Sequence, residues 1–410
     1  MPKENKKRIV HPNPTMGVKI FNLFSITADN AWFWRCHLKS VDIIVIGGGL
    51  SGSATALGLV RQGAGNVMLF DQQLPSQRLS RGNFGLTWFM CKGADHPVYA
   101  QWCRMAARQW PDFAADLLEE TGYDVELEWT GGAVHAFGED EFEAHTRSIE
   151  NITAVCKTVG LDYPVKMLNR SEFADLVPDM QLGEDVTGAM YTPEQGHVNP
   201  LMLLTALRCA FQKKGGRFQG ADSVEQIIPG NDGTVVVKTK GDTFQCEKLV
   251  IAAGHGSMRL LKSLGETLHI YPSRGQIMVT ERRPRSLTVP VLCVRQTPDG
   301  TFLIGLSTED TGLDTRTTAK AMKSQAANAI RLFPELAALN WVRAWGAIRV
   351  MTPDGAPIYS RVAGHDNIFV LALHSAVSLA PMKISAIAPW ILGKGEPEQL
   401  HHFTNGRFNV

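Results

Sequence analysis

The chain has 410 residues, of which 44% are hydrophobic and 20% charged, a composition typical of globular proteins that excludes a disordered or fibrous chain. At this length we expect two lobes rather than one compact core. The formal net charge is +1, from 41 basic and 40 acidic residues, so the charge balance argues against nucleic acid as a partner. No stretch approaches about 18 consecutive apolar residues, and we expect no transmembrane segment.

Residues 1–40 differ from the rest of the chain. They hold seven Lys or Arg and two Asp or Glu, and their aromatic residues show no clear periodicity. We expect an N-terminal extension that is disordered or not part of the fold. A secretory signal peptide is the alternative, but Asn22, Ser25 and Thr27 interrupt its apolar part.

The seven cysteines are scattered, with no two closer than 12 positions and no C-x-x-C pair. This spacing argues against an iron–sulfur cluster or a structural zinc within the chain, and we expect no metal site. An odd, scattered set fits a reducing compartment better than a disulfide framework. We therefore expect a cytoplasmic protein, with membrane association through partners as the alternative.

The strongest local pattern begins at residue 41. Residues 41–46 form a short β-branched apolar run typical of a buried strand, and the glycine-rich G-x-G-x-x-G sequence of residues 47–52 follows at once. Good helix formers come next, and a second apolar strand, residues 67–70, ends at Asp71. Strand, glycines, helix, strand and acidic residue in this order predict a dinucleotide-binding unit.

Each glycine of the motif has a physical role in this unit. Gly47 allows the tight turn out of the strand, Gly49 lets the backbone approach a pyrophosphate, and Gly52 allows close packing of helix on strand. Free N–H groups at the helix N-terminus hold the phosphates. Asp71 lies where its carboxylate can accept hydrogen bonds from the adenosine ribose. The unit alone does not choose between FAD and NAD.

Later stretches make that choice. Taken in chain order, they resemble the D-amino acid oxidase superfamily of FAD-dependent oxidoreductases over roughly residues 41–394; the stretches are 80–86, 195–200, 222–225, 249–254, 271–276, 345–357 and 368–381. Residues 82–88, 197–200 and 374–377 look most like a bacterial subgroup that includes glycine oxidase, hydroxyproline dehydrogenase beta subunits and opine oxidase B subunits. Ala376 departs from the glycine that many relatives have there.

This resemblance implies FAD as the cofactor. The residues it places at the cofactor are Gly47, Gly49, Leu50, Ser51, Gly52, Asp71, Gln72, Ser80, Asn83, Gly85, Leu86, Val224, Ala253, Gly254, Gly346, Ser378 and Leu379.

Two further residues are predicted to be catalytic. Arg349 falls where related amino-acid oxidases place the arginine that grips the substrate carboxylate, and a planar guanidinium suits a carboxylate. An ion pair with nearby Asp354 is the alternative for Arg349. His374 follows the last apolar strand, where it could equally face the substrate pocket or hold the loop.

The implied fold is α/β, with a Rossmann-like FAD-binding domain interleaved with an α+β substrate domain on a mixed or antiparallel sheet. We expect the FAD-binding domain in residues 41–94, 196–265 and 340–395. The substrate domain is expected in 95–195 and 266–339, followed by a C-terminal tail, 396–410. Aromatic residues at helical spacing near the start of the first substrate-domain segment are expected to pack in a core.

The resemblance implies oxidation of the C–N bond of a small amino or imino acid, by hydride transfer to flavin N5, to an imine that hydrolyses. The alternative is a flavin-bearing subunit of a hetero-oligomeric dehydrogenase that needs small iron–sulfur partners, which would fit the absence of clustered cysteines. A nicotinamide-dependent dehydrogenase is a third hypothesis, disfavoured because no second complete G-x-G-x-x-G occurs.

Overall fold

The computed structural model describes residues 39–72, 79–80 and 82–409. Almost all of the expected N-terminal extension lies outside these residues. The first strand begins at Lys39, two positions before the predicted start.

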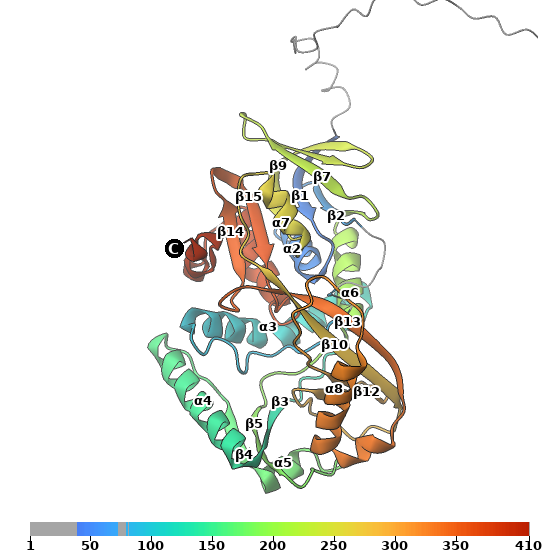
Figure 1. The fold of residues 1–410 in the computed structure, drawn as a ribbon. Coiled ribbons are helices and arrows are strands. Elements are labelled where there is room, and N and C mark those ends of the chain that lie inside the picture. The colour runs from blue at the N-terminus through green and yellow to red at the C-terminus, as the bar shows by residue number, and fades with distance from the viewer. Residues whose placement is uncertain (1–38, 73–78, 81, 410) are drawn as a thin grey trace, which may run out of the picture. The chain divides into compact units, whose positions relative to one another are not determined.

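An eight-stranded sheet carries the predicted dinucleotide-binding unit. Its parallel part has the order β15-β9-β1-β2-β6, β14 lies antiparallel at one edge, and the β7–β8 hairpin joins through β8 to β9 (Figure 1). The strands are β1 Lys39–Ile46, β2 Val67–Phe70, β6 Arg217–Gln219, β7 Val224–Pro229, β8 Val235–Thr239, β9 Thr243–Ile251, β14 Ile358–Val362 and β15 His365–Ala372.

Both faces of this sheet are buried, as expected for parallel strands covered on two sides. Ile43 and Val45 of β1 pack into one apolar cluster with α2, α3 and α6, whereas Ile44 and Ile46 pack into a second cluster with β7–β9 and α7. The register sets Ile44 opposite Met68 of β2. The helices are α2 Leu50–Arg61, α3 Pro97–Thr121, α4 Gly138–Thr158, α5 Arg170–Leu176, α6 Pro200–Lys213, α7 Gly256–Lys262, α8 Ala319–Leu332, α9 Ala380–Met382 and α10 Ala388–Ile391.

Two smaller antiparallel sheets make up the other part. One has the order β11-β12-β10-β13 and the other β3-β5-β4, and Figure 1 shows both beside α4, α5 and α8. Their strands are β3 Gly132–Phe137, β4 Lys166–Asn169, β5 Val186–Thr192, β10 Tyr271–Arg282, β11 Val294–Gln296, β12 Thr301–Gly305 and β13 Trp341–Met351. The predicted aromatic core holds, since Trp102, Trp110 and Phe113 of α3 are buried.

Strand pairing moves one predicted boundary. The sequence analysis places residues 340–395 in the FAD-binding domain, but β13 pairs with β10 along nearly its whole length and belongs to the four-stranded sheet. The apolar pattern of a strand does not name its partner, so the sequence could not place β13. The division into domains otherwise stays a prediction.

The C-terminal segment is more than a tail. The 3₁₀-helices η3 Glu398–Phe403 and η4 Asn405–Phe408 follow the π-turn η2 Lys383–Ile387 and α10, and the 3₁₀-helix η1 Pro334–Ala338 lies earlier in the chain. Leu400 and Phe403 are fully buried in the cluster that also contains α2 and α3. No helix in the described ranges is both long and apolar enough to cross a membrane.

Candidate functional site

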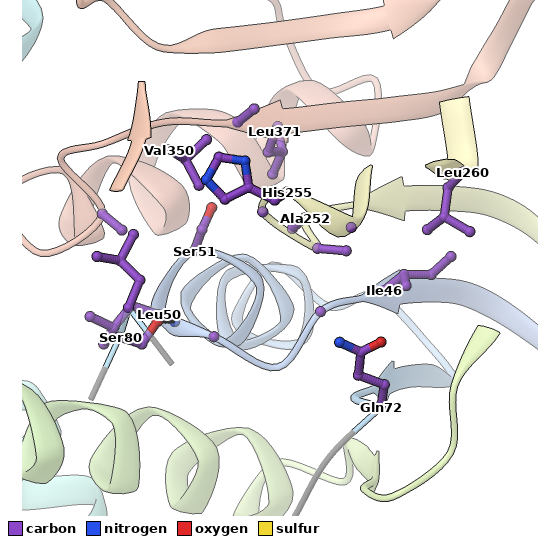
Figure 2. Close-up of a pocket in the computed structure, with 18 of the residues that line it drawn as sticks. Ile46, Leu50, Ser51, Gln72, Ser80, Ala252, His255, Leu260, Val350 and Leu371 are labelled. Carbon is purple, nitrogen blue, oxygen red and sulfur yellow. Dashed lines mark hydrogen bonds between the residues drawn. The ribbon is translucent and has the colours of Figure 1, made fainter. Parts of the chain in front are cut away.

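A cavity of about 300 Å³ opens at the carboxyl ends of the parallel strands (Figure 2). Its walls come from β1, the N-terminal turn of α2, the end of β2, the segment after β9, β13 and the end of β15. In Figure 2, Leu50 and Ser51 of α2 lie on one side, and His255 and Val350 approach from the other. The carboxyl edge of a parallel sheet is where nucleotide ligands bind in open α/β folds.

The start of α2 offers backbone N–H groups to this cavity. Gly49 is the N-cap residue and provides no side-chain cap, and the first turn contains no acidic residue. The Ser80 hydroxyl accepts a hydrogen bond from the Leu50 N–H at 3.0 Å. This helix end therefore keeps the positive dipole end that favours phosphate oxygens.

Three glycines shape this turn as the sequence predicted. Gly47 has a φ of 109°, in the region that favours glycine. A Cβ at Gly52 would overlap the carbonyl oxygen of Gly47, whereas a Cβ at Gly49 would lie 2.9 Å from the Ser80 hydroxyl, inside the cavity. Gly52 thus sets the packing of helix against strand, and Gly49 keeps the cavity open.

Two buried polar atoms in the cavity wall have no hydrogen-bond partner among the described residues. They are the Ser51 hydroxyl, in the first turn of α2, and Oδ1 of Asp222, just before β7. Buried polar atoms are normally paired, because an unpaired one costs about 1–3 kcal/mol. The unpaired atoms, the open helix end and the glycine turn fit a polar dinucleotide such as FAD.

The two ends of the cavity differ in character. Gln72, Val224 and Arg259 line one end, where the Arg259 guanidinium donates to the Val224 carbonyl at 2.8 Å. The opposite end is lined by apolar side chains of β13 and β15 together with Ala253, Gly254 and His255. An adenine and ribose suit the first end, and a flat ring suits the second.

A second cavity, of about 280 Å³, lies against the segment after β15 and the four-stranded sheet; Leu79 lines both cavities. Its walls include Asn83, Leu86, Arg349, His374 and Ser378. Figure 1 shows β13 and β10 of that sheet passing close to the ends of β14 and β15. The second cavity is therefore the natural place for a substrate beside a bound ring.

Arg349 reaches this cavity from β13. Its Nη2 donates to the Ser307 carbonyl at 2.8 Å, and its main-chain carbonyl is hydrogen-bonded to Nε2 of His255, a residue of the first cavity, at 3.1 Å. Burial lowers the pKa of the guanidinium, opposed by the charge of Glu309. The alternative partner Asp354 is instead paired with Arg407 at 2.8 Å, so the predicted competing ion pair does not form.

His374 lines the same cavity. Its side chain is open to solvent within the cavity yet surrounded by protein, and this burial lowers its pKa to about 3, with the charges of Lys92 and Arg349 contributing. His374 is therefore a neutral imidazole at ordinary pH, able to hydrogen-bond but not to carry charge.

The predicted cofactor residues divide into two groups. Most line a cavity, whereas five lie behind the walls: Gly52, Asp71, Gly85, Gly346 and Leu379. Oδ2 of buried Asp71 accepts from the Gly48 N–H at 2.9 Å, and a Cβ at Gly346 would lie 2.6 Å from the Thr315 carbonyl oxygen. Direct contacts of these five with a cofactor stay predictions.

Sequence reasoning missed several cavity residues. Asp222 and Arg259 near β7, Leu306 after β12 and Lys92 before α3 line the cavities but carry no motif. Leu306 has a φ of 81°, rare for a residue with a side chain. Only tertiary contacts bring these residues to the site.

Comparison with known proteins agrees with this geometry. The family model described as FAD dependent oxidoreductase, DAO, matches residues 42–386. The chain belongs to this family. Two cavities at the carboxyl edge of its parallel sheet are thus those of an FAD-dependent oxidoreductase.

Individual relatives cover nearly the whole chain. This FAD-dependent oxidoreductase is 35% identical over 373 residues to the B subunit of opine oxidase from Rhizobium meliloti, covering 91% of this chain and 99% of the relative. It is 26% identical over 348 residues to the glycine oxidase of Geobacillus kaustophilus, covering 83% of this chain and 90% of that protein. The crystal structure of glycine oxidase from Geobacillus kaustophilus matches with a TM-score of 0.82 and 26% identity, over 90% and 99% of the two chains.

These findings confirm the predicted family, the α/β fold class, FAD as the cofactor and the assignment to oxidoreductases. Within the part of the chain that the structure describes, no group of three or more His, Cys, Asp or Glu is arranged to hold a metal ion.

Proposed function

We propose that this enzyme oxidises the C–N bond of a small amino or imino acid whose carboxylate binds to Arg349. The observation that carries the proposal is the position of Arg349, in a cavity directly beside the one that fits FAD. Bound FAD would supply the acceptor for the two electrons and the hydrogen removed from the substrate.

The chain's own part is to bind and orient. Only one hydrogen bond from the Arg349 guanidinium to the described protein is found, so its other N–H groups are available for a carboxylate. A carboxylate fixed there limits the orientations of the adjacent C–H bond. Neutral His374 lies in the same wall, where it offers a hydrogen-bonding group without a charge that would compete for the carboxylate.

The experiment is a substrate panel. D-amino acids, glycine, sarcosine, prolines and opines are mixed anaerobically with the purified yellow protein, and loss of the flavin absorbance is followed. We expect bleaching with at least one amino or imino acid and none with the matched compound that lacks the carboxylate. If no amine in the panel bleaches the flavin, the proposal is wrong.

Arg349→Lys provides the residue-level test. Lysine keeps the charge but loses the fork of two parallel donors, so we expect KM for the substrate found above to rise about 100-fold, since a charge-assisted hydrogen bond is worth about 1.5–3 kcal/mol. Arg343→Lys is the matched control, because Arg343 lies on the same strand but is exposed. An unchanged KM in Arg349→Lys would remove Arg349 from this role.

A second proposal concerns assembly. Similarity to a protein named as one subunit of an opine oxidase supports a hetero-oligomer in which this chain carries the FAD and small partners carry iron–sulfur clusters. The test is turnover of the isolated chain with an artificial electron acceptor: full turnover alone would argue against obligate partners.

A further inference from the structure

Lys92 is a cation in the substrate cavity that the proposed mechanism does not use. It precedes α3 in a tight turn, in which Cys91 has a φ of 64° and Gly93 a φ of 75°. A Cβ at Gly93 would overlap backbone atoms of Ala100. The turn is therefore fixed by close backbone packing, and it holds Lys92 in the cavity wall.

The ammonium group of Lys92 has one hydrogen bond within the described part of the chain. Nζ donates to the Ser378 hydroxyl at 2.9 Å, and that hydroxyl in turn donates to the Leu86 carbonyl at 3.1 Å. Ser378 is also fixed through its own carbonyl, which accepts from the indole of Trp110 at 3.0 Å. An ammonium has three donors, so two remain for a ligand.

No carboxylate neutralises Lys92 among the residues that the structure describes. None of the ion pairs found there includes it, and the described cavity lining contains Lys92, Arg349 and His374 but no Asp or Glu. Burial lowers the pKa of Lys92, as expected for a cation that lacks a counter-charge. Glu309, near Arg349, is engaged with Arg274 and does not line the cavity.

Lys92 and Arg349 reach the cavity from different parts of the fold, the turn before α3 and strand β13. Each is near enough to His374 for its charge to lower the pKa of that imidazole. Two cations around one small cavity favour a ligand with two negative groups, because each anion offsets the cost of a buried charge.

We propose that Lys92 anchors a second carboxylate of the substrate, so that this enzyme prefers amino or imino acids carrying two carboxylates. This proposal rests on the proposed function, in which Arg349 holds the first carboxylate. The second carboxylate belongs either to the side chain or to a substituent on the nitrogen, and the experiment distinguishes these two sources.

Unreactive ligands test the proposal without turnover. Thiodiglycolate and (methylthio)acetate have sulfur in place of nitrogen and differ by one carboxylate, whereas glutarate and butyrate differ in the same way along a carbon chain. Binding to the FAD-loaded protein is measured by perturbation of the flavin spectrum and by calorimetry. We expect the dicarboxylate of at least one pair to bind tenfold or more tightly than its partner, the effect of one charged hydrogen bond. Equal binding within both pairs would overturn the proposal.

The variant Lys92→Met locates the effect. It should weaken dicarboxylate binding about tenfold and leave monocarboxylate binding within about twofold, since it removes only the second anchor. Lys92→Arg keeps a charge and should restore most of the preference. A uniform loss for both ligands, or a change in flavin reduction potential without a change in preference, would show that Lys92 acts on the flavin and would overturn the proposal.

Two outcomes separate this inference from the proposed function. If amino acids reduce the flavin but the wild-type protein shows no dicarboxylate preference, the inference fails and the proposed function stands. If no amine reduces the flavin, the proposed function fails, whatever the ligands do. Should Lys92→Met not fold, the wild-type preference and Lys92→Arg still decide.

Discussion

Gly49 and Gly52 belong to one motif but do different work. Gly52 is buried against the Gly47 carbonyl, where a Cβ has no room, whereas a Cβ at Gly49 would enter the cavity beside Ser80. The first glycine of this pair therefore concerns the ligand and the second the fold. The two substitutions should separate cofactor binding from stability.

We expect Gly52→Ala to lower the melting temperature strongly or prevent folding, because the backbone must move to admit the methyl group. Gly49→Ala should fold with a melting temperature of the FAD-free protein near that of the parent, but bind FAD at least tenfold more weakly. Thermal unfolding and FAD titration measure the two effects. Gly406→Ala, with nothing near the added Cβ, is the control; equal behaviour of the two motif variants would contradict this assignment.

His374 predicts a pH dependence of stability. Its pKa is lowered to about 3 by burial, with the charges of Lys92 and Arg349 contributing, whereas an unfolded histidine has a pKa near about 6.5. Between these values the unfolded chain binds a proton that the folded chain does not. The contribution is therefore complete above about pH 6.5 and is lost as the pH falls towards 3.

His374→Gln should consequently lose less melting temperature between pH 7 and pH 4 than the parent protein does. The measurement is thermal unfolding across this range at constant ionic strength. Parallel curves for the two proteins would show that the environment of His374 does not depress its pKa.

At the scale of elements, the C-terminal 3₁₀-helix η3 is part of the core. The ring of Phe403 is fully buried and meets the rings of Trp102, Tyr99 and Tyr359. These contacts tie the end of the chain to α3 and β14. A segment of this composition has no periodicity from which the contacts could be predicted.

We expect Phe403→Ala to destabilise the protein by about 3–5 kcal/mol, the usual effect of removing a buried aromatic ring. His401→Ala, on the same 3₁₀-helix but exposed, should change stability by less than about 0.5 kcal/mol. Denaturant unfolding of both variants measures the difference. A small effect of Phe403→Ala would mean that η3 does not contribute to the folded core.

At the scale of the whole molecule, the FAD cavity joins segments that are far apart in the chain. Residues near 46–51, 222–260 and 348–376 all contribute to one cavity. A ligand that contacts all of them stabilises the folded state, because it binds no comparable site in the unfolded chain.

FAD should therefore raise the melting temperature of the FAD-free protein by several degrees, since a ligand at about 100 times its Kd adds about 2.7 kcal/mol. FMN lacks the adenosine and would leave the Val224–Arg259 end of the cavity empty, so it should stabilise less at equal concentration. Thermal shift titrations with both flavins measure this. Equal stabilisation by FMN would show that the adenosine end does not contribute.

How far the sequence reached depends on the range of the interactions. The strand–glycine–helix unit and the cap of α6 by Asn199, whose side chain accepts from the Leu201 N–H at 3.0 Å, are local, and both were predicted from neighbouring residues. The cavity position of Arg349 followed from a resemblance in a short stretch.

What the sequence by itself determined is the family, the FAD-binding unit and most residues of the cofactor cavity, because steric and hydrogen-bonding needs of that unit are met by residues close in the chain. Only the tertiary structure decided the partner of β13, the burial of η3 and the place of Lys92 opposite the segment after β15. Each of these depends on contacts between residues more than 50 positions apart, and such contacts leave no local pattern in the sequence.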